Sequence, residues 1–223
     1  MKRLAAEQTL RHDRTRLFRY RPYPKQAMFH AAGREHDERL LMAANQVGKT
    51  TCGAAECALH LTGLYAEWEA ATGLTWEGRR WDRPVRGWAG SETFETTRDG
   101  VQRLLLGDPR IPDRWGTGMI PAACLVGVSR HPGVPDAVAA MMVRHVSGGI
   151  STLGTRSFDQ GRRKWAGETL DFVWFDEEPP EDVYIEGRTR TNATGGMVWL
   201  TFTPLLGMTA VVRSFQGAAG DPF

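Results

Sequence analysis

Two mostly apolar runs, each ending in polar residues, organise the hydrophobic pattern of this chain. The first lies at about residues 39–44 and the second at about residues 170–175. Continuous runs of this length, unlike alternating ones, are typical of strands buried on both faces of a parallel sheet. Helical periodicity follows the first run over residues 49–62, and Gly63 is placed to cap that helix. The pattern therefore predicts an α/β protein with a mainly parallel sheet and flanking helices.

The rest of the pattern adds shorter elements. A segment led by Pro22 and Pro24 predicts a short helix that ends at Gly33, and Ser147-Gly148-Gly149 is a hairpin turn signal between two strands. The further strands are expected over residues 84–91, 137–146, 150–158 and 197–202, with a helix over residues 92–107.

Three segments are expected to have little regular structure. Residues 65–83 are rich in Trp and Gly, residues 108–135 are rich in Gly and Pro, and residues 159–167 form a basic loop. We expect the tryptophans of the first segment to pack against the edge of the fold. The tryptophans concerned are Trp68, Trp76 and Trp81.

Composition and charge narrow the class of protein. With 223 residues and 41% hydrophobic content, the chain fits one α/β domain with an arm. It shows neither a secretory leader nor an apolar run that could span a bilayer, which predicts a cytoplasmic protein without a membrane partner. The net charge is +2, yet residues 1–25 hold eight basic residues and two acidic ones. We expect a basic arm over residues 1–20, either solvated or in contact with nucleic acid or an acidic partner protein.

The loop after the first apolar run closes with Gly48-Lys49-Thr50 and leads directly into the predicted helix. Strand, loop and helix in this order form a phosphate-binding loop, in which backbone N–H groups, the helix N-terminus and the lysine face phosphates. Ala43 stands where the usual motif has its first Gly, and an ordinary strand-to-helix turn is the alternative. The residues expected to contact a nucleotide here are Asn45, Gln46, Val47, Gly48, Lys49, Thr50 and Thr51.

The second apolar run ends in Asp176 and Glu177. In an open α/β sheet, ligands bind at the carboxyl ends of the strands, so both acids are expected beside the phosphate loop. Asp176 and the Thr50 hydroxyl would then hold Mg2+, and Glu177 would polarise the water that attacks the γ-phosphate. Ordinary acids at a helix N-terminus are the alternative, because the helix dipole favours them there.

Two further polar positions are candidates for nucleotide contact. Gln26, beside an aromatic and just ahead of the first strand, can donate to and accept from an adenine edge, or it can be a solvated helix residue. Thr201 and Thr203 end the last predicted strand, where hydroxyls can sense the γ-phosphate or complete a turn before Pro204.

Together these motifs resemble the ATPase domain of the large terminase subunit of tailed bacteriophages. The matching stretches are residues 22–26, 44–50, 161–167, 172–179 and 201–207. The resemblance implies a RecA-like phosphate-loop fold over residues 21–223, with ATP and Mg2+ as cofactors. It implies that Gln26 reads adenine, that Lys49 and Thr50 bind phosphate and metal, that Glu177 is the catalytic carboxylate, and that residues 201–203 couple hydrolysis to DNA movement.

The resemblance also implies partners. It predicts translocation of double-stranded DNA into a procapsid, contact with a portal protein and a small terminase subunit, and a ring of identical subunits. In such a ring an Arg from a neighbouring subunit completes the site. The candidates by position are Arg156, Arg162 and Arg163.

The C-terminal end departs from the family pattern, in which a metal-dependent nuclease follows the ATPase. After Gly207 only 16 residues remain, and Asp221 is their one acid. A two-metal nuclease needs several convergent carboxylates. We therefore expect no nuclease and a truncated ATPase domain. Two rival interpretations are a helicase-like ATPase and a non-catalytic remnant that binds DNA or capsid.

Overall fold

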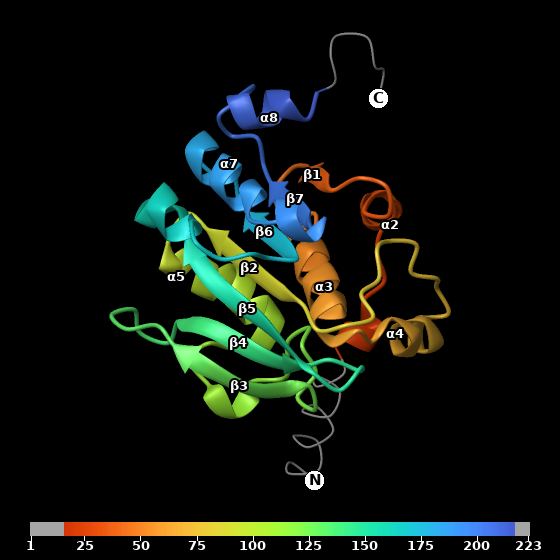
Figure 1. Ribbon diagram of the computed structural model, residues 1–223. Coiled ribbons are helices and arrows are strands. Elements are labelled where there is room, and N and C mark those ends of the chain that lie inside the picture. The colour runs from red at the N-terminus through yellow and green to blue at the C-terminus, as the bar shows by residue number, and fades with distance from the viewer. Residues whose placement is uncertain (1–15, 217–223) are drawn as a thin grey trace.

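The computed structural model describes residues 16–216 and contains one seven-stranded sheet (Figure 1). The strand order is β1-β7-β6-β2-β5-β4-β3. The first five strands in this order are parallel, whereas β4 and β3 are antiparallel additions at one side. The strands are β1 (Glu38–Met42), β2 (Arg86–Ser91), β3 (Leu125–Arg130), β4 (Val138–Arg144), β5 (Ile150–Ser157), β6 (Phe172–Asp176) and β7 (Met197–Phe202). The mainly parallel sheet expected from the sequence is confirmed.

Helices cover both faces of this sheet. Alternate residues of a strand point to opposite faces. Accordingly Trp174 of β6 packs in one apolar cluster with α3 and α4, and its neighbours Val173 and Phe175 pack in another with α7 and α8. The α-helices are α2 (Pro24–Ala32), α3 (Lys49–Thr62), α4 (Tyr65–Thr72), α5 (Phe94–Thr97), α6 (Arg103–Leu106), α7 (Glu181–Thr189) and α8 (Ala210–Ser214).

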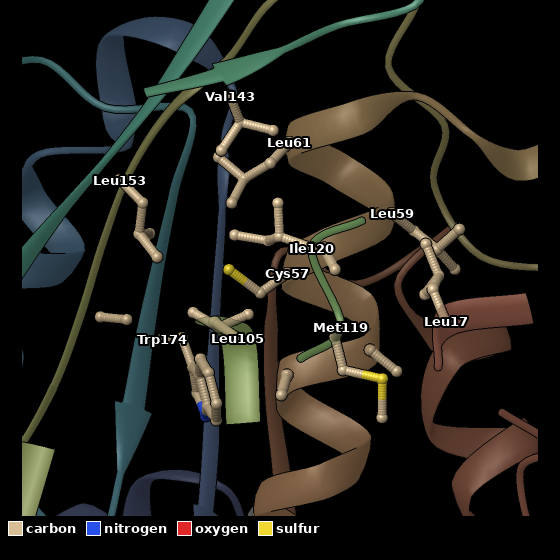
Figure 2. Close-up of a cluster of buried hydrophobic side chains, with 14 of the residues drawn as sticks. Leu17, Cys57, Leu59, Leu61, Leu105, Met119, Ile120, Val143, Leu153 and Trp174 are labelled. Carbon is tan, nitrogen blue, oxygen red and sulfur yellow. The ribbon is translucent and has the colours of Figure 1, made fainter. Parts of the chain in front are cut away.

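Helix α3 is the centre of the larger cluster. Figure 2 shows Leu61 of α3 against Val143 of β4, and Leu17 beside Leu59. Leu17 belongs to the short turn η1 (Leu17–Arg19) and is fully buried. Packing therefore extends into the last residues of the predicted basic arm, whereas the prediction for residues 1–15 lies outside the described residues.

The segment 65–83 is not irregular throughout, as the sequence predicted, because it begins with helix α4. Tyr65, Trp68 and Thr72 form the buried side of this helix, and the Trp68 indole donates to the carbonyl of Tyr20. Tertiary packing of the large aromatic residues thus stabilises a helix that the local composition concealed. The expected burial is confirmed for Trp68 and Trp76, and Trp81 is partly buried.

Two further boundaries differ from the prediction. Strand β3 lies within the expected loop 108–135, and its register against β4 shifts twice. The helix expected over residues 92–107 starts at Phe94, after the cap residue Thr93, and contains the π-helical turn η2 (Arg98–Gln102). No helix among the described residues has both the length and the apolar content needed to cross a membrane.

Candidate nucleotide-binding site

Three loops meet at one edge of the sheet because their strands are neighbours and run parallel. Met42 of β1 pairs with Phe202 of β7, and Asp176 of β6 pairs with Thr201 of β7. The residues that follow each strand therefore leave the sheet at the same edge. This edge is where an open α/β sheet binds ligands.

The phosphate loop is built for close approach to an anion. Gly48 precedes α3 in the left-handed region at φ 83°, which a glycine adopts at low cost, and Gln46 adopts φ 62°. Helix α3 begins at Lys49, so its first N–H groups and the positive end of its dipole face the loop. Asn45, Gln46 and Val47 are exposed and Thr51 is half-buried, which leaves the loop open to a ligand.

Lys49 connects the phosphate loop to the end of β7. Its side chain is 8% exposed, and its ammonium donates to the Ala44 carbonyl at 2.7 Å and to Thr203 Oγ1 at 2.9 Å. The Thr203 hydroxyl in turn donates to Asn45 Oδ1 at 2.7 Å. The structure thus brings Thr203 to Lys49 and Asn45, although Thr203 lies 154 residues after Lys49 in the sequence.

Asp176 is a buried carboxylate with hydroxyl partners. It is 4% exposed and accepts a hydrogen bond from Thr201 Oγ1 at 2.8 Å. Burial raises the pKa of Asp176 to about 7, although hydrogen bonds from Thr201 and Thr50 and the charge of Lys49 oppose the shift. A nearby cation would favour the ionised form of this carboxylate.

The oxygen atoms of this site are suitable ligands for Mg2+. A carboxylate oxygen and a hydroxyl oxygen, from Asp176 and Thr50, are hard ligands of the kind that Mg2+ prefers. Within residues 16–216 no three His, Cys, Asp or Glu side chains form a group that could hold a metal ion. The residues present suit a metal that takes one or two protein ligands and completes its shell with water and phosphate oxygens.

Glu177 follows Asp176 in an unusual backbone conformation. Its φ is 95°, which is strained for a residue with a Cβ, and its N–H donates to the Thr201 carbonyl at 3.1 Å. Burial and the charge of Glu92 raise the pKa of Glu177, whereas the charge of Lys49 lowers it. Glu92 follows β2 and was missed by the sequence analysis, since a single acid at a helix start carries no motif.

Gln26 lies beside the phosphate loop on helix α2. Its amide nitrogen donates to the Gly48 carbonyl at 3.1 Å, and its amide oxygen accepts from the Tyr23 N–H at 2.9 Å. A cavity of about 420 Å³ opens here, with Tyr20, Tyr23, Gln26, Gly48 and Thr51 among its walls. Tyr20 falls within the predicted arm, and no sequence motif marks it as a wall residue.

Among the described residues, no ion pair joins any of the three candidate arginines to Asp176 or Glu177. Arg156 stacks on Trp88, with its guanidinium carbon 4.1 Å from the ring centroid, and pairs with Glu168. Arg162 pairs with Glu186 of α7 at 2.8 Å. Arg163 is exposed and makes no ion pair with any residue between 16 and 216. The prediction that one of them serves a neighbouring subunit stays a prediction.

Comparison with known proteins identifies relatives of this chain. A family model described as "Terminase large subunit, T4likevirus-type, N-terminal" matches residues 40–216. The large terminase subunit of Salmonella phage P22 is 43% identical in an alignment of 209 residues that covers 89% of this chain and 42% of that protein. The large terminase subunit of Enterobacteria phage LP7 is 30% identical over 139 residues, covering 56% of this chain and 27% of the relative.

The fold has a structural relative as well. It is similar to the crystal structure of the HK97 bacteriophage large terminase, with a TM-score of 0.50 and 14% identity over 82% of this chain and 33% of that chain. This similarity supports the RecA-like α/β fold. The chain spans 42% of the length of the phage P22 relative. Because the family model covers the phosphate loop, the Asp176–Glu177 pair and Thr203, the chain belongs to the family of N-terminal domains of phage terminase large subunits.

Proposed function

We propose that this chain is the ATP-hydrolysing motor domain of a phage genome-packaging terminase. The observation that carries the proposal is the convergence at one edge of the sheet of Lys49, which follows β1, Thr203, which follows β7, and Asp176, which ends β6. Membership of the terminase large-subunit family supports the same function. It also disfavours the rival interpretation as a helicase-like ATPase.

The geometry suits binding of a nucleoside triphosphate with its phosphates at the start of α3. Lys49 would move from Ala44 and Thr203 onto phosphate oxygens and neutralise their charge. Thr50 and Asp176 would hold Mg2+, which supplies charge neutralisation at the β- and γ-phosphates. Gln26 would contact the base from the wall of the neighbouring cavity.

Glu177 is the residue that would orient the attacking water. Its strained backbone turns this carboxylate out of the buried strand at the edge that also holds Lys49. The water oxygen attacks the γ-phosphorus in line with the departing ADP oxygen, and its proton passes toward the Glu177 carboxylate. Positioning and electrostatics would supply most of the acceleration.

The assembled machine would add the remaining parts. We propose that copies of the full subunit form a ring in the host cytoplasm at a procapsid portal, together with a small terminase subunit. Arg162 or Arg163 would reach the site of the next copy, and residues 201–203 would couple phosphate release to movement of double-stranded DNA. The exposed position of Arg163 in the basic loop is compatible with this role.

Two substitutions test the proposal. Lys49→Ala should weaken ATP binding by a factor of about 100 or more, because the buried phosphate site loses its one ammonium group. Glu177→Gln should leave ATP affinity within about twofold and reduce turnover by a factor of at least about 100, since general-base contributions are typically of this size. ATP affinity is measured by titration calorimetry and turnover by phosphate release at high protein concentration, with and without DNA.

Glu181→Gln is the matched control for Glu177→Gln, because Glu181 lies four residues further on and is exposed. It should hydrolyse ATP as the unaltered chain does. Full turnover by Glu177→Gln would show that another group orients the water. DNA retention by a chain that binds no ATP would instead favour the non-catalytic remnant.

A further inference from the structure

A buried polar network lies behind the candidate base cavity, on the side of helix α3 that faces α2 and β1. We call it the Glu56 network after its central residue, which is 0% exposed. The Glu56 carboxylate accepts from Arg39 Nη2 at 2.6 Å through one oxygen, and from His30 Nδ1 at 2.8 Å through the other. The members are Tyr20, His30, Arg39, Glu56, His60 and Tyr65.

This network joins the segments that form the cavity wall. His30 lies four residues after Gln26, on the same face of α2. Its Nε2 atom lies 2.8 Å from the Tyr20 hydroxyl, and Tyr20 is itself a wall residue. Glu56 lies on α3, whose first turn holds the wall residue Thr51. A single carboxylate thus connects the base side of the cavity to the phosphate-loop helix.

Arg39 ties the same two helices to the strand that precedes the phosphate loop. Its guanidinium donates to the Phe29 carbonyl on α2 at 2.8 Å as well as to Glu56 on α3. It also lies over the Phe29 ring, with 4.7 Å between the guanidinium carbon and the ring centroid. The planar fork of an arginine fixes both direction and distance of such contacts.

We propose that Glu56 is a positioning residue for base selectivity. By holding His30 and Arg39, it sets the distance between the wall formed by Tyr20 and Gln26 and the phosphate site at Lys49. The base of an adenine nucleotide can then contact this wall while its phosphates contact Lys49. The proposal rests on the proposed ATP site, and it concerns the base half of the nucleotide alone. Glu56 itself contacts neither half.

The test compares ligands that use both sites with one that uses the phosphate site alone. Equilibrium binding of Mg-ATP, Mg-GTP and Mg-tripolyphosphate is measured for the unaltered chain, Glu56→Gln and His30→Leu. His30→Leu leaves the Glu56–Arg39 pair in place and guards against loss of folding in Glu56→Gln. We expect ATP affinity to fall about five- to tenfold in both variants, the size of one or two lost hydrogen bonds.

Tripolyphosphate affinity should stay within about twofold, because this ligand uses the phosphate site alone. The preference for ATP over GTP should shrink, because that preference depends on the position of the cavity wall formed by Tyr20 and Gln26. His30→Asn should restore the preference, because its amide can donate from nearly the position of Nδ1. Asp171→Asn is the matched control. Asp171 is a 5% exposed carboxylate that pairs with Arg83 just before β6, at the opposite edge of the sheet from the phosphate loop.

Each outcome decides one point. Equal losses for ATP and tripolyphosphate in Glu56→Gln and His30→Leu would show a general structural role and overturn the positioning role. An unchanged ATP preference would overturn it too, and so would a lost preference in Asp171→Asn. If the unaltered chain binds neither ATP nor tripolyphosphate, the proposed ATP site itself fails, and the positioning role of Glu56 fails with it.

Discussion

Helix α3 has a polar cluster at its start and another in its middle, and the two differ in how their charges are satisfied. At the start, the Lys49 ammonium donates to the Ala44 carbonyl and to the Thr203 hydroxyl, and Glu177 adopts a strained backbone conformation. In the middle, both oxygens of Glu56 are paired with cationic or imidazole donors inside the core. We call Asn45, Lys49, Asp176, Glu177 and Thr203 the edge cluster. The residues of the edge cluster can exchange their hydrogen-bond partners for a ligand, and those of the Glu56 network cannot.

This difference separates residues that would take part in the reaction from residues that stabilise the fold. A buried carboxylate such as Asp176, whose pKa is raised to about 7 by burial, is poorly satisfied until a cation arrives. Glu56 has the opposite character, because Arg39 and His30 hold its pKa well below the usual range in spite of burial. Substitutions at the edge should therefore change activity, and substitutions in the network should change stability or selectivity.

The largest expected effect is on folding. Arg39→Ala should lower the free energy of unfolding by about 3–5 kcal/mol, because it removes the guanidinium that pairs with the buried Glu56 carboxylate. Arg34→Ala is the matched control, since Arg34 and Glu77 form an exposed pair at 3.9 Å. Such a pair contributes about 0–1 kcal/mol. Urea unfolding of both variants gives the comparison. Equal losses of unfolding free energy would mean that the Glu56 network stabilises the fold no more than an exposed ion pair does.

The members of the edge cluster were predictable as neighbours because they follow strands in recognisable motifs. Gly48-Lys49-Thr50 and Asp176-Glu177 each follow an apolar run, and parallel strands carry such residues to a common edge. The Glu56 network gave no such signal. Glu56 and Arg39 are single charges within otherwise apolar elements, and only the packing of α2 against α3 and β1 shows that they meet.

The fold was predictable where local signals agreed. The bounds of α3 and β7 match the prediction, because periodicity and the left-handed Gly63 define the helix and six consecutive buried residues define the strand. Helix α4 and strand β3 were missed. The first depends on tertiary burial of Trp68, and the second is a half-exposed strand with a shifting register. Neither feature has a local signature.

The Glu56 network should also give the protein a pH dependence of stability. Contacts with Cys52 and Glu56 raise the pKa of His30 from 6.5 to about 9, although burial opposes this. The folded pKa exceeds the unfolded one, so the stabilisation is complete below pH 6.5 and is lost as the pH rises through about 9. The other ionisable groups that face this ring or its carboxylate partner are Tyr20, Arg39, Cys52 and His60.

We expect the free energy of unfolding to fall between pH 6.5 and 8.5 by roughly 2 kcal/mol, with a slope of at most about 1.4 kcal/mol per pH unit. Urea unfolding at several pH values measures the slope. His30→Leu should flatten it, whereas Lys49→Ala should keep it. A slope that survives His30→Leu would mean that another group titrates with folding.

The smallest expected effect lies at the edge cluster and concerns turnover alone. Thr203→Val replaces the hydroxyl that accepts from Lys49 and donates to Asn45 with a methyl group. Because Thr203 is half-exposed, the free energy of unfolding should change by less than about 0.5 kcal/mol. The kcat/KM for ATP should fall about tenfold, since Lys49 loses the partner that holds it at the phosphate site before ATP binds. Thr203→Ser keeps both hydrogen bonds and should keep turnover, so a tenfold loss in that variant as well would point to the methyl group and its packing rather than to the hydroxyl.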